Sequence, residues 1–276
     1  MQNKIRTTTL DDDSADLFVG YLKSRGKSAN TQRAYRSDLH QFMLVVGTCP
    51  QEKFEDEAML WLNDTRESTA PKTTGRRLTS LRGFARWAGW GDVLDEYSTP
   101  TPAKPIPHPL PEGIAGVRLM IGKAANNEER ALIALCGLCG MRVSEALSIL
   151  PTDFDLAEMT VKIRGKGDKS RVVPVSPEAW TALAPSVTRA FCGVGSATVT
   201  GMYDRQARRC VTRLARKAHL KRHVSSHDLR ATFATAVYDK TMDIRLVQEL
   251  LGHSSVEQTQ VYTGIAMSKM KEGVKL

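Results

Sequence analysis

The chain is 276 residues long, and its 41% hydrophobic and 25% charged residues are typical of a folded protein rather than a disordered one. No segment approaches the roughly 18 consecutive apolar residues of a membrane span, and the N-terminus lacks the apolar run of a signal peptide. We therefore expect a cytoplasmic protein whose five cysteines remain reduced. The 39 basic and 30 acidic side chains give a formal net charge of +9, which favours a polyanionic partner.

A proline-rich segment divides the chain. Residues 98–111 contain six of the twelve prolines, and because proline fixes φ and lacks an N–H donor, we expect an extended connector here. The predicted organisation is a first domain over residues 1–97, the linker over 98–111 and a second domain over 112–276. Residues 1–110 carry 15 basic and 14 acidic side chains, whereas residues 111–276 carry 24 and 16, so the positive charge is concentrated in the second domain.

The first domain is predicted to be a small helical bundle. Apolar residues recur at helical spacing in four segments, and no segment shows the alternation of a strand. The second of these segments is expected to begin at an N-cap at Asn30 or Thr31. The four apolar stripes consist of Leu17, Phe18, Tyr21 and Leu22; Tyr35, Leu39, Phe42, Met43 and Val46; Ala58, Met59 and Leu62; and Leu78, Leu81, Ala85 and Ala88.

Arginines accompany the fourth apolar stripe. Arg76, Arg77, Arg82 and Arg86 lie mostly away from its apolar face. Contact with a nucleic acid and simple exposure to solvent explain these arginines equally well. Arg76, Arg77 and Arg82 are the candidate contacts.

Residues 159–175 interrupt the helical pattern of the second domain. Val161 and Ile163 alternate with polar residues, Gly165 and Gly167 mark a turn, and β-branched residues resume after it. This pattern predicts a β-hairpin. The expected fold is therefore mainly α: a helical bundle followed by a mixed α+β domain with a small antiparallel sheet.

Residues 205–222 are the most basic segment of the chain: eight of these eighteen residues are lysine or arginine, and none is acidic. Apolar residues recur on one predicted helix face and basic residues on another, so one face can pack while the other neutralises phosphates. A merely solvated helix would usually carry both signs of charge, so a nucleic acid is the favoured partner. The candidate contacts are Arg205, Arg208, Arg209, Arg213, Arg216 and Lys217.

Three short segments hold candidate catalytic residues. In the first, Gly140 and Met141 precede Arg142, which is thereby predicted to lie at a helix N-terminus, where the helix dipole favours an anion. A surface ion pair between Arg142 and Glu145 is an equally good interpretation of this segment.

The second segment is His227-Asp-Leu-Arg230. A spacing of three puts the two side chains on one helical face. An imidazole beside a permanent positive charge suits an anionic substrate that also needs proton transfer. A helix-capping histidine followed by a surface arginine would give the same sequence, and the segment taken alone favours that simpler interpretation.

The third segment contains a histidine and a tyrosine. An apolar helix is predicted to end at Gly252, His253 follows in the turn, and Tyr262 lies nine residues further on. A tyrosine attacks phosphorus only if its phenol, with a pKa of about 10, loses its proton and nearby cations hold the phosphate. The alternative is an ordinary half-buried tyrosine.

Two metal-site alternatives are weaker. Cys136 and Cys139 have the spacing of zinc ligands, but no second pair follows and both lie in an apolar run, so we expect buried thiols. His223 and His227 are four residues apart, with no third ligand nearby in the sequence. We expect no metal ion and no organic cofactor.

The candidate residues occur in a fixed order along the chain: an arginine, a hairpin lysine, His-x-x-Arg, a histidine and a tyrosine. With this order, the sequence resembles the tyrosine recombinases of the phage integrase family from about residue 14 onward. Its most specific parts are Leu-Gly-His-Ser-Ser at residues 251–255 and Gln-Val-Tyr-Thr at residues 260–263. The resemblance implies a helical core-binding domain, a linker and a catalytic domain.

The resemblance also implies covalent DNA chemistry, in which a tyrosine attacks a phosphodiester and leaves a 3′-phosphotyrosyl bond and a free 5′-hydroxyl. Such a transesterification needs no ATP, because the bond energy is kept, and fixed cations supply what a metal would contribute. For the hairpin lysine, Lys166 in the Gly-Lys-Gly turn is favoured over Lys169 and Arg171. The implied roles are phosphate binding by Arg142 and Arg230, a further hydrogen bond from His253, leaving-group protonation by Lys166, nucleophilic attack by Tyr262, acid–base catalysis by His227 and orientation of Arg142 or the histidines by Glu145.

Only about a dozen residues precede the first predicted helix, so we expect a minimal integrase without an arm-binding domain, acting in integration or excision. An Xer-like dimer resolvase is the alternative; a type IB topoisomerase and a non-catalytic DNA-binding protein are less favoured. The implied partners are double-stranded DNA at specific core sites in the nucleoid and further copies of the chain. Because the tail after the tyrosine docks on a neighbouring protomer in relatives, we expect a homotetramer on paired sites, without membrane contact.

Overall fold

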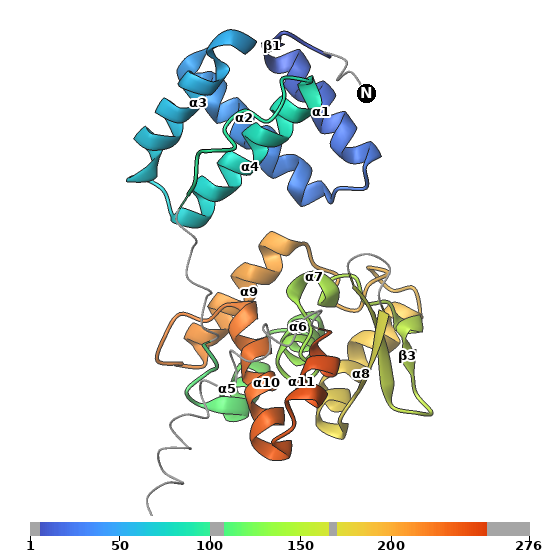
Figure 1. The fold of residues 1–276 in the computed structure, drawn as a ribbon. Helices are drawn as coiled ribbons and strands as arrows, with labels where there is room; N and C mark the ends of the chain where they lie inside the picture. The colour runs from blue at the N-terminus through green and yellow to red at the C-terminus, as the bar shows by residue number, and fades with distance from the viewer. Residues whose placement is uncertain (1–5, 100–107, 166–169, 253–276) are drawn as a thin grey trace, which may run out of the picture. The chain divides into compact units, whose positions relative to one another are not determined.

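The computed structural model describes residues 6–99, 108–165 and 170–252. The chain forms two compact units, Met1–Lys104 and Pro105–Leu276, and the division falls inside the proline-rich segment. Helices dominate both units, and a small antiparallel sheet lies in the second (Figure 1), which confirms the predicted fold class.

The first unit is a bundle of four helices. One short strand precedes the bundle and pairs in antiparallel fashion with another inside it. This pairing was not predicted, because a strand of two residues is too short to show an alternating pattern. The elements are β1 (Thr9–Leu10), α1 (Asp12–Ser24), α2 (Ala29–Val46), β2 (Cys49–Pro50), α3 (Gln51–Arg66) and α4 (Pro71–Ala88).

Aromatic side chains fill the core of the first unit. Phe54 packs edge-on against Trp90 with ring centroids 5.0 Å apart, and Phe42 packs edge-on against Trp61 at 5.5 Å. Most residues of the four predicted apolar stripes are buried or pack against this core. Leu17 is the exception: it lies on the outer side of α1 and is 65% exposed.

The N-cap of α2 is Ser28, not Asn30 or Thr31 as predicted. The Ser28 side chain accepts a hydrogen bond from the backbone N–H of Thr31, and the helix begins at Ala29. Ser28, in extended conformation, satisfies a free N–H of the first helical turn as well as Asn30 or Thr31 would. The sequence alone therefore did not distinguish these three N-cap candidates.

The second unit surrounds one buried helix with other helices and a three-stranded sheet. All residues from 131 to 137 of this helix, α6, are buried, and it packs against α5, α8, α9 and α10. The elements are α5 (Gly113–Gly122), α6 (Asn127–Gly137), α7 (Val143–Ala146), η1 (Pro151–Asp153), β3 (Phe154–Asp155), β4 (Thr160–Arg164), β5 (Ser170–Pro174), α8 (Pro177–Phe191), α9 (Asp204–Lys217), α10 (Ser226–Thr241) and α11 (Ile244–Leu251).

The predicted hairpin is present as β4 and β5, which pair in antiparallel fashion, with β3 on the other side of β4. Val161 lies opposite Val173, and Ile163 lies opposite Arg171. Val161, Ile163 and Val173 are buried in the core of the unit. The alternation of side chains along a strand therefore directs Arg171 to the same inner face as Val173.

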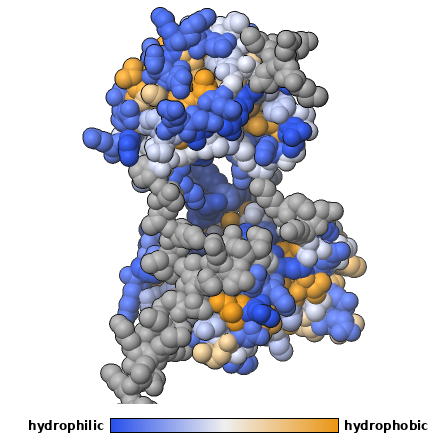
Figure 2. All heavy atoms as spheres, viewed as in Figure 1, coloured by the Kyte–Doolittle hydropathy of each residue, from blue (hydrophilic) through white to orange (hydrophobic). Residues whose placement is uncertain are grey.

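Within the described ranges, no helix is long and apolar enough to cross a lipid bilayer. On the face seen in Figure 2, hydrophilic residues cover most of both units and hydrophobic residues form separate small patches.

Candidate active site

A tight turn after α6 positions Arg142. Gly140 has φ +66°, a conformation that favours glycine. A Cβ at this position would also lie 2.4 Å from Cδ1 of Phe233, so no larger residue fits. Arg142 follows as the N-cap residue of α7, as predicted. Because α7 is a single turn, the positive charge here comes mainly from the guanidinium, whose side chain is 42% exposed.

The carboxylate of Glu145 binds Arg142 from the third position of α7. Its Oε2 accepts the backbone N–H of Arg142 at 2.8 Å, and its Oε1 accepts Nη1 of the same residue at 2.8 Å. Glu145 is 5% exposed. The predicted pair is therefore present, and its carboxylate is buried rather than on the surface. Orientation of Arg142 by Glu145 stays a prediction, and these two contacts are the ones that would provide it.

Arg171 is a second partner of the same carboxylate. Its Nη1 and Nη2 donate to the two oxygens of Glu145 at 3.1 and 2.8 Å, and its Nε donates to the carbonyl oxygen of Leu250 at 2.9 Å. From the sequence, Arg171 was considered only as a rival of Lys166 for the role of the hairpin lysine. In the structure, the Arg171 side chain is only 12% exposed and forms an ion pair with Glu145 inside the second unit.

Arg230 is the third cation at Glu145, with Nη1 3.6 Å from Oε2. It donates to the carbonyl oxygens of Gly140 and Leu251, each at 2.6 Å. Its side chain is 1% exposed. The interpretation of His227-x-x-Arg230 as a capping histidine with a surface arginine is therefore wrong, because Arg230 is buried and the cap of α10 is Ser225.

The surroundings lower the pKa values of two groups at the site, Glu145 and His227. Burial alone would raise the pKa of Glu145, but hydrogen bonds from Arg171 and Arg142 outweigh it and lower the pKa to about 2. His227 lies in the first turn of α10. Partial desolvation of its ring, and secondly the charge of Arg230, lower its pKa below the ordinary value. Glu145 is thus a permanent anion, and His227 stays neutral near pH 7.

The end of α11 lies at the same cluster. Gly252 ends the helix with φ +63° in the left-handed region, as predicted. Three of the predicted catalytic residues, Lys166, His253 and Tyr262, lie outside the described residues. Their roles, like those of the other site residues, stay predictions. The described part of the site brings together Arg142, Arg230 and Glu145 from the predictions and adds Arg171, which the sequence analysis missed.

A signal for Arg171 was present in the sequence. Residues 171, 173 and 175 alternate along the predicted second strand of the hairpin, and Val173 and Val175 face the core. An arginine in phase with two buried valines must find a buried partner, because an unpaired charge in the interior is costly. The pattern did not identify which carboxylate that partner is.

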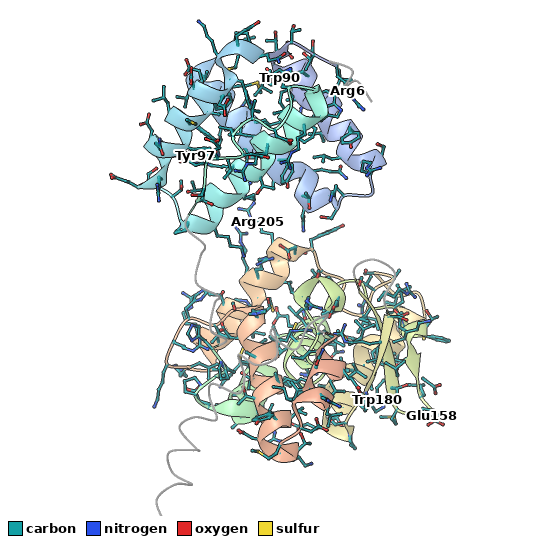
Figure 3. All side chains as sticks on the ribbon, viewed as in Figure 1. Arg6, Trp90, Tyr97, Glu158, Trp180 and Arg205 are labelled. Carbon is teal, nitrogen blue, oxygen red and sulfur yellow. The ribbon has the colours of Figure 1, made fainter. Side chains whose placement is uncertain are left out.

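The basic segment forms α9 with the predicted division of faces. Ala207, Cys210, Val211 and Leu214 are buried. Arg205 extends from the first turn of α9 (Figure 3). The other exposed basic side chains of the helix are those of Arg208, Arg209, Arg216 and Lys217.

Two arginines of α9 are already paired with carboxylates. Arg208 pairs with Asp204 on the same helix, and Arg213, which is partly buried, pairs with Glu129 of α6. No ion pair to the described residues occupies Arg205, Arg209 or Arg216. These three are therefore the arginines of the helix most available to an external anion.

The arginines of α4 are engaged inside the first unit. Arg76 donates to the buried carboxylate of Asp38 at 2.6 Å, and Arg82 donates to the carbonyl oxygen of Tyr97 at 2.6 Å. Arg77 is 8% exposed and lies over the ring of Trp61, 4.7 Å from its centroid. The interpretation of Arg77 as a solvent-exposed arginine is therefore wrong. Contacts of Arg76, Arg77 and Arg82 with DNA stay predictions.

The two cysteines with the spacing of zinc ligands are free thiols packed in the core. Cys136 and Cys139 are completely buried, as expected, and burial raises the pKa of each thiol to about 12. Within the described part of the chain, no three histidine, cysteine, aspartate or glutamate side chains come close enough together to hold a metal ion.

The arrangement is suited to an anion in a low-dielectric setting. Arg142 is partly open to solvent, whereas Arg171 and Arg230 are nearly enclosed. One carboxylate cannot neutralise three guanidinium groups, so the cluster carries net positive charge. Fixed donors of this kind stabilise negative charge that develops on a bound phosphate, because they need no reorganisation when the charge appears.

Comparison with known proteins identifies the family. Residues 118–269 match the model of the phage integrase family, and residues 15–91 match that of the phage integrase N-terminal SAM-like domain. Tyrosine recombinase XerC of Corynebacterium glutamicum is 33% identical over an alignment that covers 96% of this chain and 90% of the relative. Tyrosine recombinase XerD of Pseudomonas putida is 29% identical, with 95% and 96% covered.

Solved structures agree in fold. A XerH site-specific recombinase bound to palindromic difH substrate matches with a TM-score of 0.70 at 20% identity, covering 100% of this chain and 99% of that one. A lambda integrase dimer bound to a COC′ core site matches with a TM-score of 0.73 at 16% identity, covering 94% and 78%. Since the catalytic-domain model alone spans more than half of the sequence, and the C. glutamicum relative aligns with nearly all of it, the chain belongs to the phage integrase family and is a site-specific recombinase of the tyrosine type.

Proposed function

We propose that this recombinase cuts and rejoins double-stranded DNA at specific core sites through a 3′-phosphotyrosyl bond to Tyr262. The observation that carries the proposal is the cluster of Arg142 and Arg230 on the shared, buried carboxylate of Glu145. Two predicted phosphate-binding residues, 88 positions apart in the sequence, thereby meet at one place. A surface role for either residue would not require this buried charge network.

The charges at the site support a division of labour in the proposed reaction. Arg142 and Arg230 hold the non-bridging oxygens of the scissile phosphate and stabilise the extra negative charge of the transition state. His253 adds a hydrogen bond to the same oxygens. The Tyr262 oxygen forms a bond to phosphorus as the bond to the 5′-oxygen breaks, and Lys166 gives that leaving oxygen a proton.

Proton removal from the phenol is assigned to His227. A general base must be neutral before the reaction, and the lowered pKa of His227 keeps its imidazole unprotonated near neutral pH. The guanidinium of Arg230, three residues away on α10, contributes to this shift. Resealing of the strand reverses the two proton transfers.

The exposed basic face of α9 is the proposed contact with the DNA backbone. We expect Arg209→Gln to weaken binding to every DNA sequence and to reduce the slope of log affinity against log salt by about one, since each neutralised phosphate contributes about 0.9. Fluorescence anisotropy over a salt series measures both quantities.

Arg118→Gln is the matched control for that measurement. Arg118 is an exposed arginine of α5 that pairs with Glu178 at 2.6 Å. The Arg118→Gln protein should bind DNA with the same salt dependence as the parent. An unchanged slope for Arg209→Gln would remove Arg209 from the DNA interface.

The experiment that tests the proposed reaction is covalent capture of DNA. A duplex nicked next to the cleavage position loses the short cleaved fragment, so the protein stays joined to the 3′ end. The expected product withstands denaturant, forms in EDTA, and yields a phosphotyrosyl peptide containing Tyr262 by mass spectrometry. A joined peptide without Tyr262, or no joined product on fragments of the source genome, would refute the assignment.

Sequencing the captured DNA also distinguishes the biological roles. Ends of a mobile element or phage indicate integration and excision, which remain our first proposal. A chromosomal or plasmid resolution site indicates the Xer-like role, which the likeness to relatives named XerC and XerD favours. Strand exchange between two such sites separates either role from a type IB topoisomerase. We also propose that the protein acts as a homotetramer on paired sites in the nucleoid.

A further inference from the structure

The side chain of Arg171 connects three elements that contain a predicted site residue or lie close to one in the sequence. It belongs to β5, which begins four residues after Lys166. Its Nη1 and Nη2 bind Glu145 on α7, and its Nε binds the carbonyl oxygen of Leu250 in α11. The reaction proposed above gives this buried arginine no role.

Only an arginine can make all of these contacts. Three of its N–H directions are used at once, two toward the carboxylate and one toward the carbonyl oxygen. A guanidinium presents these donors in a fixed planar fork, whereas a lysine ammonium is a point charge on a flexible stem. Replacement by lysine would keep the charge and lose the geometry.

The end of α11 is attached to this arginine. The last carbonyl groups of a helix have no partner within the helix. Here Leu250 accepts from Arg171 and Leu251 accepts from Arg230. At Gly252 a Cβ would lie 2.9 Å from Cδ of Arg171, so the left-handed turn packs directly on the arginine side chain.

We propose that Arg171 is a positioning residue for strand cleavage, which holds Glu145 in place beside Arg142 and sets the point from which the chain runs on to His253 and Tyr262. This role rests on the phosphotyrosyl chemistry proposed above. Arg171 acts through Glu145 and the end of α11 and does not itself bind the phosphate.

The positioning role of Arg171 has a measurable consequence for the pKa of Glu145. The carboxylate of Glu145 faces Arg142 from its own turn, Arg171 from β5 and Arg230 from α10. Hydrogen bonding by Arg171 is the strongest influence that lowers the pKa of this carboxyl group. Without Arg171 the pKa of Glu145 rises, and NMR titration of the side-chain carboxyl carbon of Glu145 measures this shift separately from the titration of His227. A residue that only stabilised the fold would not move this pKa.

The test compares Arg171→Gln and Arg171→Lys with the parent in the full chain. Single-turnover cleavage of the nicked duplex should slow by about 100-fold in Arg171→Gln, the effect of a small misplacement of reacting groups. Arg171→Lys should lose less, and both variants should keep the DNA affinity of the parent. Arg118→Gln, which removes an exposed arginine, should cleave as the parent does.

A double-mutant cycle with Glu145→Gln tests whether Arg171 acts through the carboxylate. The combined loss of cleavage should be smaller than the product of the two single losses, because residues in one network do not act independently. Independent losses, or a Glu145 pKa that does not rise in Arg171→Gln, would overturn the proposal. If Arg171→Gln does not fold, Arg171→Lys decides: cleavage at the parental rate would overturn it.

The two proposals fail in different ways. A parent protein that forms no covalent product at all refutes the phosphotyrosyl chemistry. A parent that cleaves normally, together with Arg171 variants that cleave equally fast at every pH, refutes only the positioning role.

Discussion

Tyr262→Phe is expected to bind DNA with parental affinity and to form no covalent product with the nicked duplex. The substitution removes one oxygen atom, which is the proposed nucleophile, and keeps the ring. Because no other group of the proposed site becomes joined to the strand, the loss should be complete within the detection limit of a denaturing gel.

Tyr238→Phe is the matched control for the nucleophile. Tyr238 belongs to α10 and packs against a small separate apolar cluster of the same unit, which includes Val247. Loss of its phenolic oxygen should leave covalent capture unchanged. A Tyr262→Phe protein that still becomes joined to DNA would contradict the proposed chemistry, whatever its effect on the rate.

Glu145→Gln is expected to lower the free energy of unfolding of the second unit by about 3–5 kcal/mol, the cost of removing one partner from a buried ion pair. The amide keeps the shape of the side chain but leaves the three guanidinium groups close together without a counter-charge. Urea unfolding at pH 7, with amide hydrogen exchange of the buried helix α6 as the signal of this unit, measures the difference.

The difference should depend on pH in a defined direction. The pKa of Glu145 falls from 4.5 to about 2 on folding, so its charge stabilises the folded state fully above about pH 4.5. The contribution declines as the pH falls toward 2, and parent and Glu145→Gln should converge there. A constant difference between pH 3 and pH 7 would show that the charge is not its source.

Glu158→Gln is the control for these unfolding experiments. Glu158 is an exposed carboxylate between β3 and β4 (Figure 3). It has no ion pair to the described residues, so its substitution should change the unfolding free energy by less than about 0.5 kcal/mol.

Local patterns predicted the features that depend on neighbours in the chain. The hairpin was recognised from the alternation of Val161 and Ile163, and the end of α11 from Gly252. Arg142 was placed correctly because Gly140 permits the sharp turn before it. Each of these features is set by backbone conformation over a few residues, which side-chain type strongly restricts.

Other features escaped prediction because two equally good local solutions existed. Ser28 and Thr31 are both good N-cap residues, and only the course of the backbone selects Ser28. Arg77 was expected on a solvated or DNA-binding face, yet it lies against Trp61 on another helix. Its long apolar stem and the face of an indole ring make that burial favourable.

The order of the candidate catalytic motifs, the basic face of α9 and the mainly helical fold were determined by the sequence alone, because periodicity and residue chemistry act over short distances. The partnership of Glu145 with Arg171, 26 residues away, and of Arg230 with Gly140, 90 residues away, was decided only by the tertiary structure. Ion pairing depends on distance and on exclusion of water. Packing of α7, β5, α10 and α11 against one another sets both.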